Sequence, residues 1–142
     1  MQRDMTDAFT IKSAADGASL ILRWEDPDQF QAEIRRPRLG ANTRVASRVA
    51  RSGDQSDGLA EFFGGLAADW KGWIGSREWK SLERDLILSA KHGPGGIALK
   101  MQLHHGAPPV WKLECELGLE SAQLDQLATA AATFERSRRS AI

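Results

Sequence analysis

Alternation between hydrophobic and polar residues is the strongest pattern in this chain, and it predicts a series of half-buried β-strands. In the segments 30–34, 97–103 and 111–119, every second residue is hydrophobic and the residues between them are mostly polar. Short turns rich in glycine and proline separate the later segments, which favours an antiparallel meander. Weaker strand-like runs are found at 9–11, 19–24, 43–51 and 82–90.

The spacing of hydrophobic residues changes to three and four in two places, which is typical of amphipathic helices. One hydrophobic stripe runs from Leu59 to Trp73 and predicts a helix over about 57–73, with Ser56 or Asp57 capping its first turn. A second stripe predicts a helix over about 121–137. The expected fold is therefore α+β: one antiparallel sheet of about six or seven strands with two helices packed on one face.

Composition narrows the class of protein without identifying it. The chain has 142 residues, of which 42% are hydrophobic and 27% charged, as expected for a single globular domain spanning 1–142. Lysine plus arginine equals aspartate plus glutamate at 19 each, so no net field attracts nucleic acid or a membrane, and we expect neither partner. The opening residues, MQRDMTDAF, lack the order of a secretory signal, which predicts a cytoplasmic protein.

The side chains that could act in catalysis or bind a metal form no recognisable catalytic set. His104 and His105 are adjacent on an expected strand, so their side chains should point to opposite faces, and His92 has no partner at ligand spacing. Glu83 and Asp85 are expected to form surface ion pairs with nearby cations. We expect no catalytic residue, metal or cofactor. The alternative is a small-ligand-binding protein or a hydrolytic enzyme with a pocket between sheet and helix.

The charge distribution is most uneven between residues 35 and 51, where six arginines occur without any acid. Arg35, Arg44 and Arg48 are expected on the polar faces of two strands. If those strands pair, the three guanidinium groups form a stripe that could bind a carboxylate or phosphate of a partner. The alternative is that acids on other strands, such as Glu114 and Glu116, neutralise the stripe.

The segment from Gly65 to Glu83 contains three of the five tryptophans, and they could form either a core or a binding surface. Trp70 and Trp73 continue the helical stripe, and Trp111 alternates in phase with hydrophobic residues of its strand. These phases favour burial of all three. Trp79 falls in the expected connection, where core and surface remain equally open. The lone cysteine, Cys115, is expected to be a buried small hydrophobic residue.

Several of these motifs resemble a known family. The runs FFGGLAADWKGW (62–73) and WKSLE (79–83) and the strand leading to His92 are similar to an actinobacterial family of small proteins of unknown function. They are more distantly similar to immunity proteins of the WapI type. The resemblance covers roughly 59–134. The structural signature consists of six residues, the last of them in the strand expected over 111–119: Phe62, Leu66, Trp70, Trp73, Trp79 and Trp111.

The resemblance implies an α+β domain with no established catalytic residues, so no functional residue is carried over. Through the more distant link it implies a protein that binds and neutralises a bacterial toxin. The leading hypothesis is therefore a non-enzymatic interaction domain with a protein partner. The partner's identity and the oligomeric state stay open.

Overall fold

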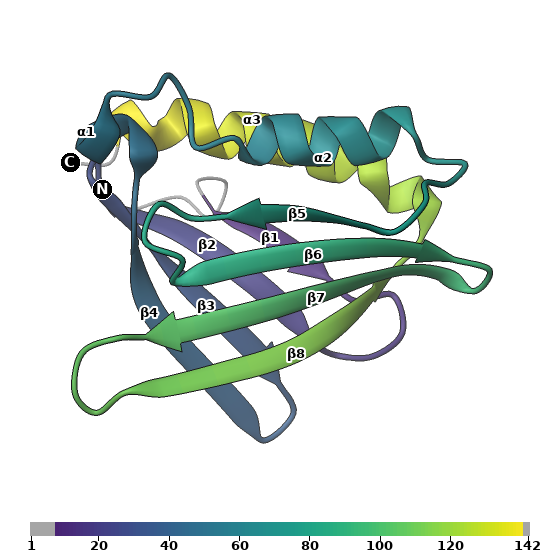
Figure 1. Cartoon of the computed structure of the whole chain (residues 1–142), viewed down its shortest axis with the longest axis horizontal. Coiled ribbons are helices and arrows are strands. Elements are labelled where there is room, and N and C mark those ends of the chain that lie inside the picture. The colour runs from purple at the N-terminus through teal and green to yellow at the C-terminus, as the bar shows by residue number, and fades with distance from the viewer. Residues whose placement is uncertain (1–7, 141–142) are drawn as a thin grey trace.

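Eight β-strands form two antiparallel sheets in the computed structural model, which describes residues 8–140 (Figure 1). In each sheet, four strands pair in the order in which they occur along the chain. The first sheet contains β1 (Phe9–Lys12), β2 (Ser19–Asp26), β3 (Gln29–Arg36) and β4 (Leu39–Ala46). The second contains β5 (Ser76–Lys80), β6 (Leu86–Gly93), β7 (Gly96–His105) and β8 (Trp111–Leu119).

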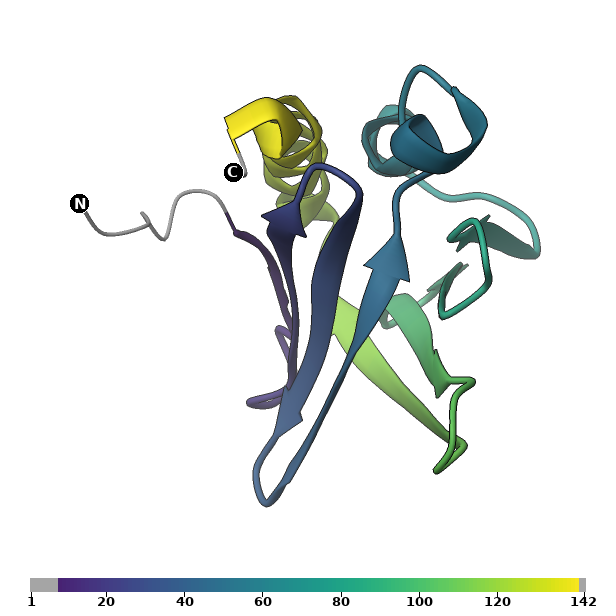
Figure 2. The same cartoon turned by 90° about the vertical axis from the view of Figure 1, so that its left-hand side faces the viewer.

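The helices occupy the connection between the sheets and the C-terminal part of the chain. They are α1 (Arg48–Ser52), α2 (Leu59–Ala68) and α3 (Leu124–Arg136), with short 3-10 turns η2 (Ser121–Gln123) and η3 (Ser137–Ser140) around α3. Helices α2 and α3 pack side by side across one end of both sheets, and Figure 2 shows the sheets on either side beneath them. Four strands followed by a long helix thus occur twice.

The α+β class and the antiparallel pairing are confirmed, but the prediction of one sheet with six or seven strands is wrong. Alternation within a segment identifies a strand and says nothing about which strands share a sheet. Here α1 and α2 separate β4 from β5 in sequence, and the two strands do not pair.

Aromatic side chains fill the space between the sheets and the helices. Phe134 of α3 stacks on Trp24 of β2 with ring centroids 4.9 Å apart, and Phe30 of β3 meets Phe134 edge-on at 5.6 Å. The Trp24 Nε1–H also donates to the main-chain oxygen of Phe134 at 2.7 Å. Phe9 and Phe63 add a further edge-on pair at 5.4 Å. The space between sheet and helix is therefore packed with rings.

The predicted strand over 43–51 is wrong in its second half. Strand β4 ends at Ala46, and Ser47 caps the start of α1: its Oγ accepts a hydrogen bond from the Val49 N–H at 3.2 Å. Val45 and Val49 are four residues apart, a spacing that fits a strand and a helix equally well. Arg44 therefore lies on β4, whereas Arg48 is the first residue of α1.

Two other boundaries differ from the sequence-based expectation. The first predicted helix ends at Ala68 instead of residue 73, and residues 69–75 form a loop in which Gly72 and Gly75 have positive φ. The strand expected over 82–90 runs from Leu86 to Gly93, because residues 81–85 form a turn in which Arg84 has a φ of 63°. The helix expected over 121–137 corresponds to η2 and α3.

Between residues 8 and 140, no helix is both long and apolar enough to cross a bilayer. Residues 1–7, which contribute most of the opening segment used to predict a cytoplasmic location, lie outside the described residues.

Candidate functional site

The loop between α2 and β5, residues 69–75, exposes two large hydrophobic side chains. Trp70 is 51% exposed and Ile74 is fully exposed. We call this segment the Trp70 loop. The prediction that Trp70 lies in the core is wrong, because α2 ends at Ala68 and the hydrophobic stripe ends with it. The Lys71 ammonium group lies 5.6 Å from the centre of the Trp70 ring.

Hydrogen bonds from two distant elements hold the main chain of the Trp70 loop in place. The Trp70 carbonyl oxygen lies 3.2 Å from Nε2 of His92, at the end of β6, and accepts a bond from the Ser121 hydroxyl at 3.3 Å. Within the loop, the Gly72 N–H donates to the Asp69 carbonyl at 2.8 Å. The loop is therefore fixed to both the second sheet and η2, the turn that precedes α3.

Side chains at both ends of the loop add further contacts. Arg77 forms an ion pair with Asp69 at 2.8 Å, and its guanidinium group lies 5.1 Å from the centre of the Trp73 ring. The Trp73 Nε1–H donates to the Ala90 carbonyl at 3.2 Å, so this ring attaches the loop to β6. Trp73 is half-buried and packs against the core, whereas Ile74 next to it points into solvent.

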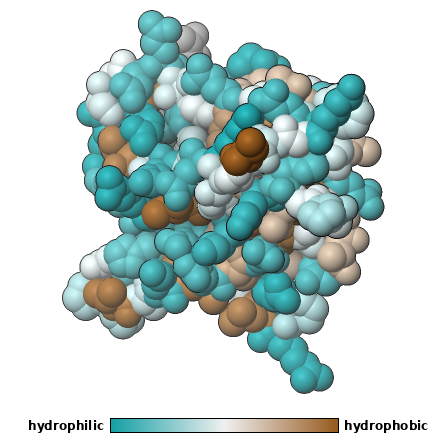
Figure 3. Space-filling view, turned by 45° about the vertical axis from the view of Figure 1, so that its right-hand side comes forward, coloured by the Kyte–Doolittle hydropathy of each residue, from teal (hydrophilic) through white to brown (hydrophobic). Residues whose placement is uncertain are grey.

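A shallow cavity of about 270 Å³ lies beside Trp70, between α2 and the start of α3. Its lining residues are Ala67, Trp70, Ser121, Ala122, Leu124 and Asp125. Figure 3 brings this side of the molecule forward and shows a largely hydrophilic surface in which hydrophobic side chains form small separate areas. The Trp70 loop thus offers a projecting hydrophobic contact next to a recess.

The other residues of the aromatic signature divide between core and partial burial. Trp79 is 7% exposed, lies in β5, and donates from Nε1 to the Asp57 carbonyl at 2.7 Å, which places it in the core. Leu66 is fully buried. Phe62 and Trp111 are partly buried and pack against the core, and Trp111 stacks on His105 with centroids 5.6 Å apart.

The three arginines do not form the expected stripe. Arg35 on β3 forms an ion pair with Glu33 at 2.9 Å, and Arg44 on β4 forms one with Glu25 at 3.0 Å. Arg48 lies on α1, and its guanidinium group donates to the Lys80 carbonyl at 2.8 Å.

The acids that pair with Arg35 and Arg44 come from the first sheet itself and not from Glu114 or Glu116. A partner-binding role for the three arginines stays a prediction.

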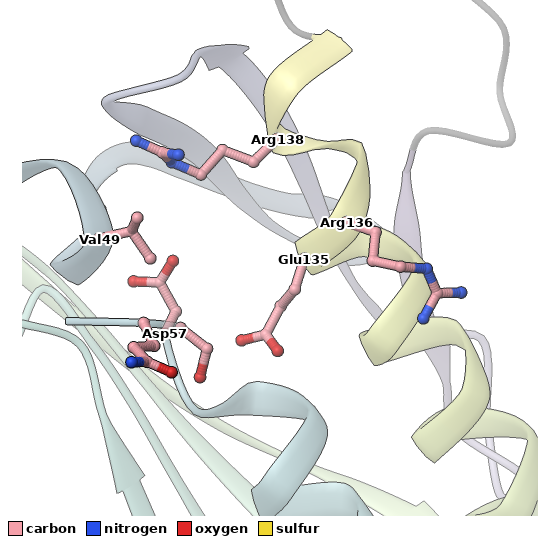
Figure 4. Close-up of a pocket in the computed structure, with 7 residues that line it drawn as sticks. Val49, Asp57, Glu135, Arg136 and Arg138 are labelled. Atoms are coloured by element: carbon pink, nitrogen blue, oxygen red, sulfur yellow. The ribbon is translucent and has the colours of Figure 1, made fainter.

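A polar pocket of about 380 Å³ lies where the C-terminal end of α3 meets α1 and the start of α2 (Figure 4). Glu135 of α3 accepts hydrogen bonds there from the N–H groups of Leu59 at 3.0 Å and Ala60 at 3.4 Å, which are the first two residues of α2. Burial raises the pKa of Glu135, and these hydrogen bonds only partly oppose that effect.

Asp57 lines the same pocket, but its hydrogen bonds are to residues at the start of α1. Its carboxylate accepts hydrogen bonds from the Ser47 hydroxyl at 2.9 Å and from the Arg48 N–H at 2.6 Å. The predicted capping of α2 by Ser56 or Asp57 is therefore wrong, since Glu135 supplies the acceptor from another helix. Arg138 also lines the pocket, and its Nε has no hydrogen-bond partner within residues 8–140.

The remaining titratable side chains are spread over separate elements. Burial, followed by the nearby Glu83 carboxylate, raises the pKa of Asp85, which lies in the turn before β6. His105 makes a hydrogen bond between Nδ1 and the Thr43 hydroxyl at 2.9 Å, which joins the two sheets. Across the described part of the chain, no three histidine, cysteine or acidic residues are grouped so that they could hold a metal ion.

Cys115 on β8 is half-buried, which differs from the expected full burial. Burial raises the pKa of its thiol. The thiol is therefore less readily ionised than an exposed cysteine.

Comparison with known proteins gives one match. The profile of a family of unknown function, DUF6228, matches residues 18–138, a range that spans seven of the eight strands and the three α-helices. No curated protein and no solved structure matches the chain. The expected resemblance to a family of unknown function is confirmed at that level, while the link to WapI-type immunity proteins stays a prediction. Because the match covers most of its length, this chain belongs to the DUF6228 family of unknown function.

Proposed function

We propose that this domain binds a protein partner and that the Trp70 loop is its contact. One observation carries this proposal: Trp70 and Ile74 are exposed on a loop whose main chain is held by the second sheet and by η2. Single exposed hydrophobic side chains are common on protein surfaces. Here two of them lie on one loop whose main chain is held at Trp70, so the backbone of the contact surface is preformed.

The energy available from such a contact is substantial for a small surface. Covering a fully exposed isoleucine side chain removes it from water and contributes about 1.5 to 3 kcal/mol. Tryptophan is among the residues that most often dominate binding energy at protein interfaces. Because the main chain of the loop is already held at Trp70, less backbone entropy is lost when a partner covers these side chains.

The surroundings of the loop favour a folded protein as the partner. The recess between Trp70 and Asp125 could accept one side chain of the partner while Ile74 enters a pocket on it. The exposed Lys71 and Asp125 are placed to form a polar rim. A surface of this kind matches another shaped surface better than a flexible segment.

In its specific form, the proposal is that the partner is a bacterial toxin and that the domain neutralises it by covering it. What supports this form is that the Trp70 loop lies inside the segment 62–83, on which the resemblance to immunity proteins rests. The chain would then act as a cytoplasmic, non-enzymatic inhibitor.

The test compares two aspartate substitutions of exposed hydrophobic residues. Ile74→Asp places a charge in the proposed contact, whereas Val110→Asp changes a side chain that is 64% exposed in the loop between β7 and β8. Each protein is used as bait in the native host, and the captured proteins are quantified by mass spectrometry.

We expect partners that the wild type and Val110→Asp retain and that Ile74→Asp loses. Equal capture by all three proteins would contradict the assignment of the loop. The toxin form is tested by co-expressing the chain with a toxin encoded beside it, where only the Ile74→Asp variant should fail to protect the cell.

A second candidate is a small-ligand-binding or hydrolytic role in the pocket at Glu135. The observation that favours it is that one pocket is lined by a carboxyl group with a raised pKa and by the Arg138 Nε, which has no hydrogen-bond partner among the described residues. A thermal-shift screen with small carboxylates and phosphates tests it: a ligand that stabilises the wild type but not Arg138→Gln would support it.

A further inference from the structure

The outer edge of β8 presents main-chain groups that no other described strand occupies. β8 is the last strand of the second sheet and pairs only with β7. It pairs without a register shift along its whole length, from Trp111 opposite His105 to Leu119 opposite Ile97. In such a regular antiparallel strand, alternate residues direct both the N–H and the C=O away from the neighbouring strand.

Two hydrogen bonds show which residues of β8 point outward. The Gly118 carbonyl accepts a bond from the Ala14 N–H at 2.7 Å, and the Gly118 N–H donates to the Ser13 hydroxyl at 3.1 Å, so both groups face away from β7. On β7, the His104 N–H donates to the Asp85 carbonyl beside β6, so it is not used to bond Lys112 opposite it on β8.

Counting back from Gly118 in steps of two, the outward residues are Glu116, Glu114 and Lys112. Within residues 8–140, no hydrogen bond occupies their main-chain groups.

Another segment of the same chain already forms hydrogen bonds with the C-terminal end of this edge of β8. The segment Ser13–Ala14, in the connection between β1 and β2, lies along Gly118 and contacts it much as a short strand would. The free part of the edge begins directly beyond that contact. An added strand would therefore extend an existing arrangement.

Side chains on the two faces of β8 define what such a strand must look like. Trp111, Leu113 and Cys115 face the core side and are only half-buried, which leaves part of their hydrophobic surface uncovered. Glu114 and Glu116 are exposed on the other face. An added strand gains most if its residues on the core side are hydrophobic and those beside the glutamates are basic.

We propose that the edge of β8 from Lys112 to Glu116 binds an extended peptide segment of alternating hydrophobic and basic residues, which adds to the second sheet as an antiparallel strand. Main-chain hydrogen bonds supply affinity in this mode of recognition, and the alternate side chains supply selectivity. The site is separate from the Trp70 loop and does not depend on the function proposed above.

The proposed pairing with β8 defines the sequence of a test peptide. In the peptide acetyl-KVKVE-amide, bound antiparallel, the two lysines lie opposite Glu116 and Glu114, the glutamate lies opposite Lys112, and the valines cover the core side. The control peptide acetyl-EVEVK-amide has the same composition of strand-forming residues and reversed charges. Two further peptides carry N-methyl groups, either on the central lysine and the glutamate or on the two valines.

The measurement is an NMR titration of the isotopically labelled full chain with each peptide. We expect KVKVE to shift the amide signals of residues 111–116 and to slow hydrogen exchange at Lys112, Glu114 and Glu116. The reversed peptide should bind roughly tenfold more weakly, because three favourable cross-strand pairs become unfavourable. Methylation of the valines should leave binding intact, while methylation of the lysine and glutamate should abolish it, because only those residues bond to β8.

A matched pair of variants tests the same register from the protein side. Glu114→Pro removes an N–H group that points away from β7, a position at which an edge strand tolerates proline. It should abolish KVKVE binding with the β6 and β7 signals unchanged, while Glu114→Gln keeps the donor and keeps most of the binding. The double change Glu114→Lys with Glu116→Lys should transfer the preference to EVEVK.

Two results would overturn the proposal. One is a set of shifts confined to other elements, the Trp70 loop included. The other is equal binding of the two N-methylated peptides, which would show that side chains alone hold the peptide.

Discussion

Glu135 joins the last helix to the first turn of α2, and removing its carboxylate should destabilise the whole domain. Leu59 is fully buried, and the only acceptor found for its N–H among the described residues is Glu135, since the cap residue Gly58 has no side chain to offer. Loss of an exposed helix cap costs about 1 kcal/mol, and because this N–H is buried the cost lies toward the upper end of about 1 to 3 kcal/mol.

Relief of the buried carboxylate offsets part of this cost, so we expect Glu135→Ala to lower the free energy of unfolding by about 2 kcal/mol. For a chain of this length that corresponds to a fall in Tm of about 6 °C. Urea denaturation should show a lower midpoint with an unchanged m-value, because the same surface is exposed on unfolding.

Glu135→Gln is the matched control, since its amide oxygen still accepts a hydrogen bond and it cannot ionise. At pH 7 it should keep most of the stability that the alanine variant loses. Equal destabilisation by the two substitutions, or none by alanine, would refute the capping role.

The same pair of proteins gives a pH dependence with a definite sign. Burial raises the pKa of Glu135 above its ordinary value of 4.5, so the native state holds this proton more tightly than the unfolded state does. The stability contributed by protonation is complete below that ordinary value and is lost as the pH rises through the raised pKa. The free energy of unfolding of the wild type, relative to Glu135→Gln, should therefore fall as the pH rises from about 4.5.

Substitutions at four further residues test the packing and the capping of α1. Trp79→Ala should cost about 3 to 5 kcal/mol in urea denaturation, whereas Trp70→Ala should change stability by about 0.5 kcal/mol or less, and similar values for both would contradict their different burial. Trp24→Phe should cost about 2 kcal/mol by calorimetry, because it removes the hydrogen bond to the Phe134 carbonyl and leaves a gap. Asp57→Ala should lower the free energy of unfolding by about 2 kcal/mol, because the start of α1 loses its hydrogen-bond acceptor. Asp57→Asn keeps one acceptor oxygen and should lower it by about half as much.

The parts of the fold that sequence reasoning predicted are those with a local signal. Strands β3, β7 and β8 alternate over several residues, and α3 carries a complete hydrophobic stripe, so each was found close to its observed bounds. Strand β5 was missed because its five residues place a single large hydrophobic side chain, Trp79, in the core. One buried residue cannot show a period of two.

The candidate site was harder to predict because its contacts join distant segments. The spacing of Trp70 and Trp73 fits a longer helix, but the chain leaves helical geometry already at Asp69, where φ is -106° and ψ is 35°. The hydrogen bond that the Leu59 N–H donates to Glu135 joins residues 76 positions apart, and no local pattern indicates it. The free edge of β8 likewise depends on which strands share a sheet.

The hydrogen bond between Trp24 and Phe134 has a consequence for how the protein is made. It joins residues that are 110 positions apart, so the aromatic face of β2 is translated long before α3, which covers it. At the usual speed of translation, about 5 to 20 residues per second, that interval is roughly 6 to 22 s. During this time the first four strands are available to pair while their inner face lacks its cover. The nascent chain is therefore most exposed to aggregation, and most open to chaperone binding, until Phe134 has left the ribosome.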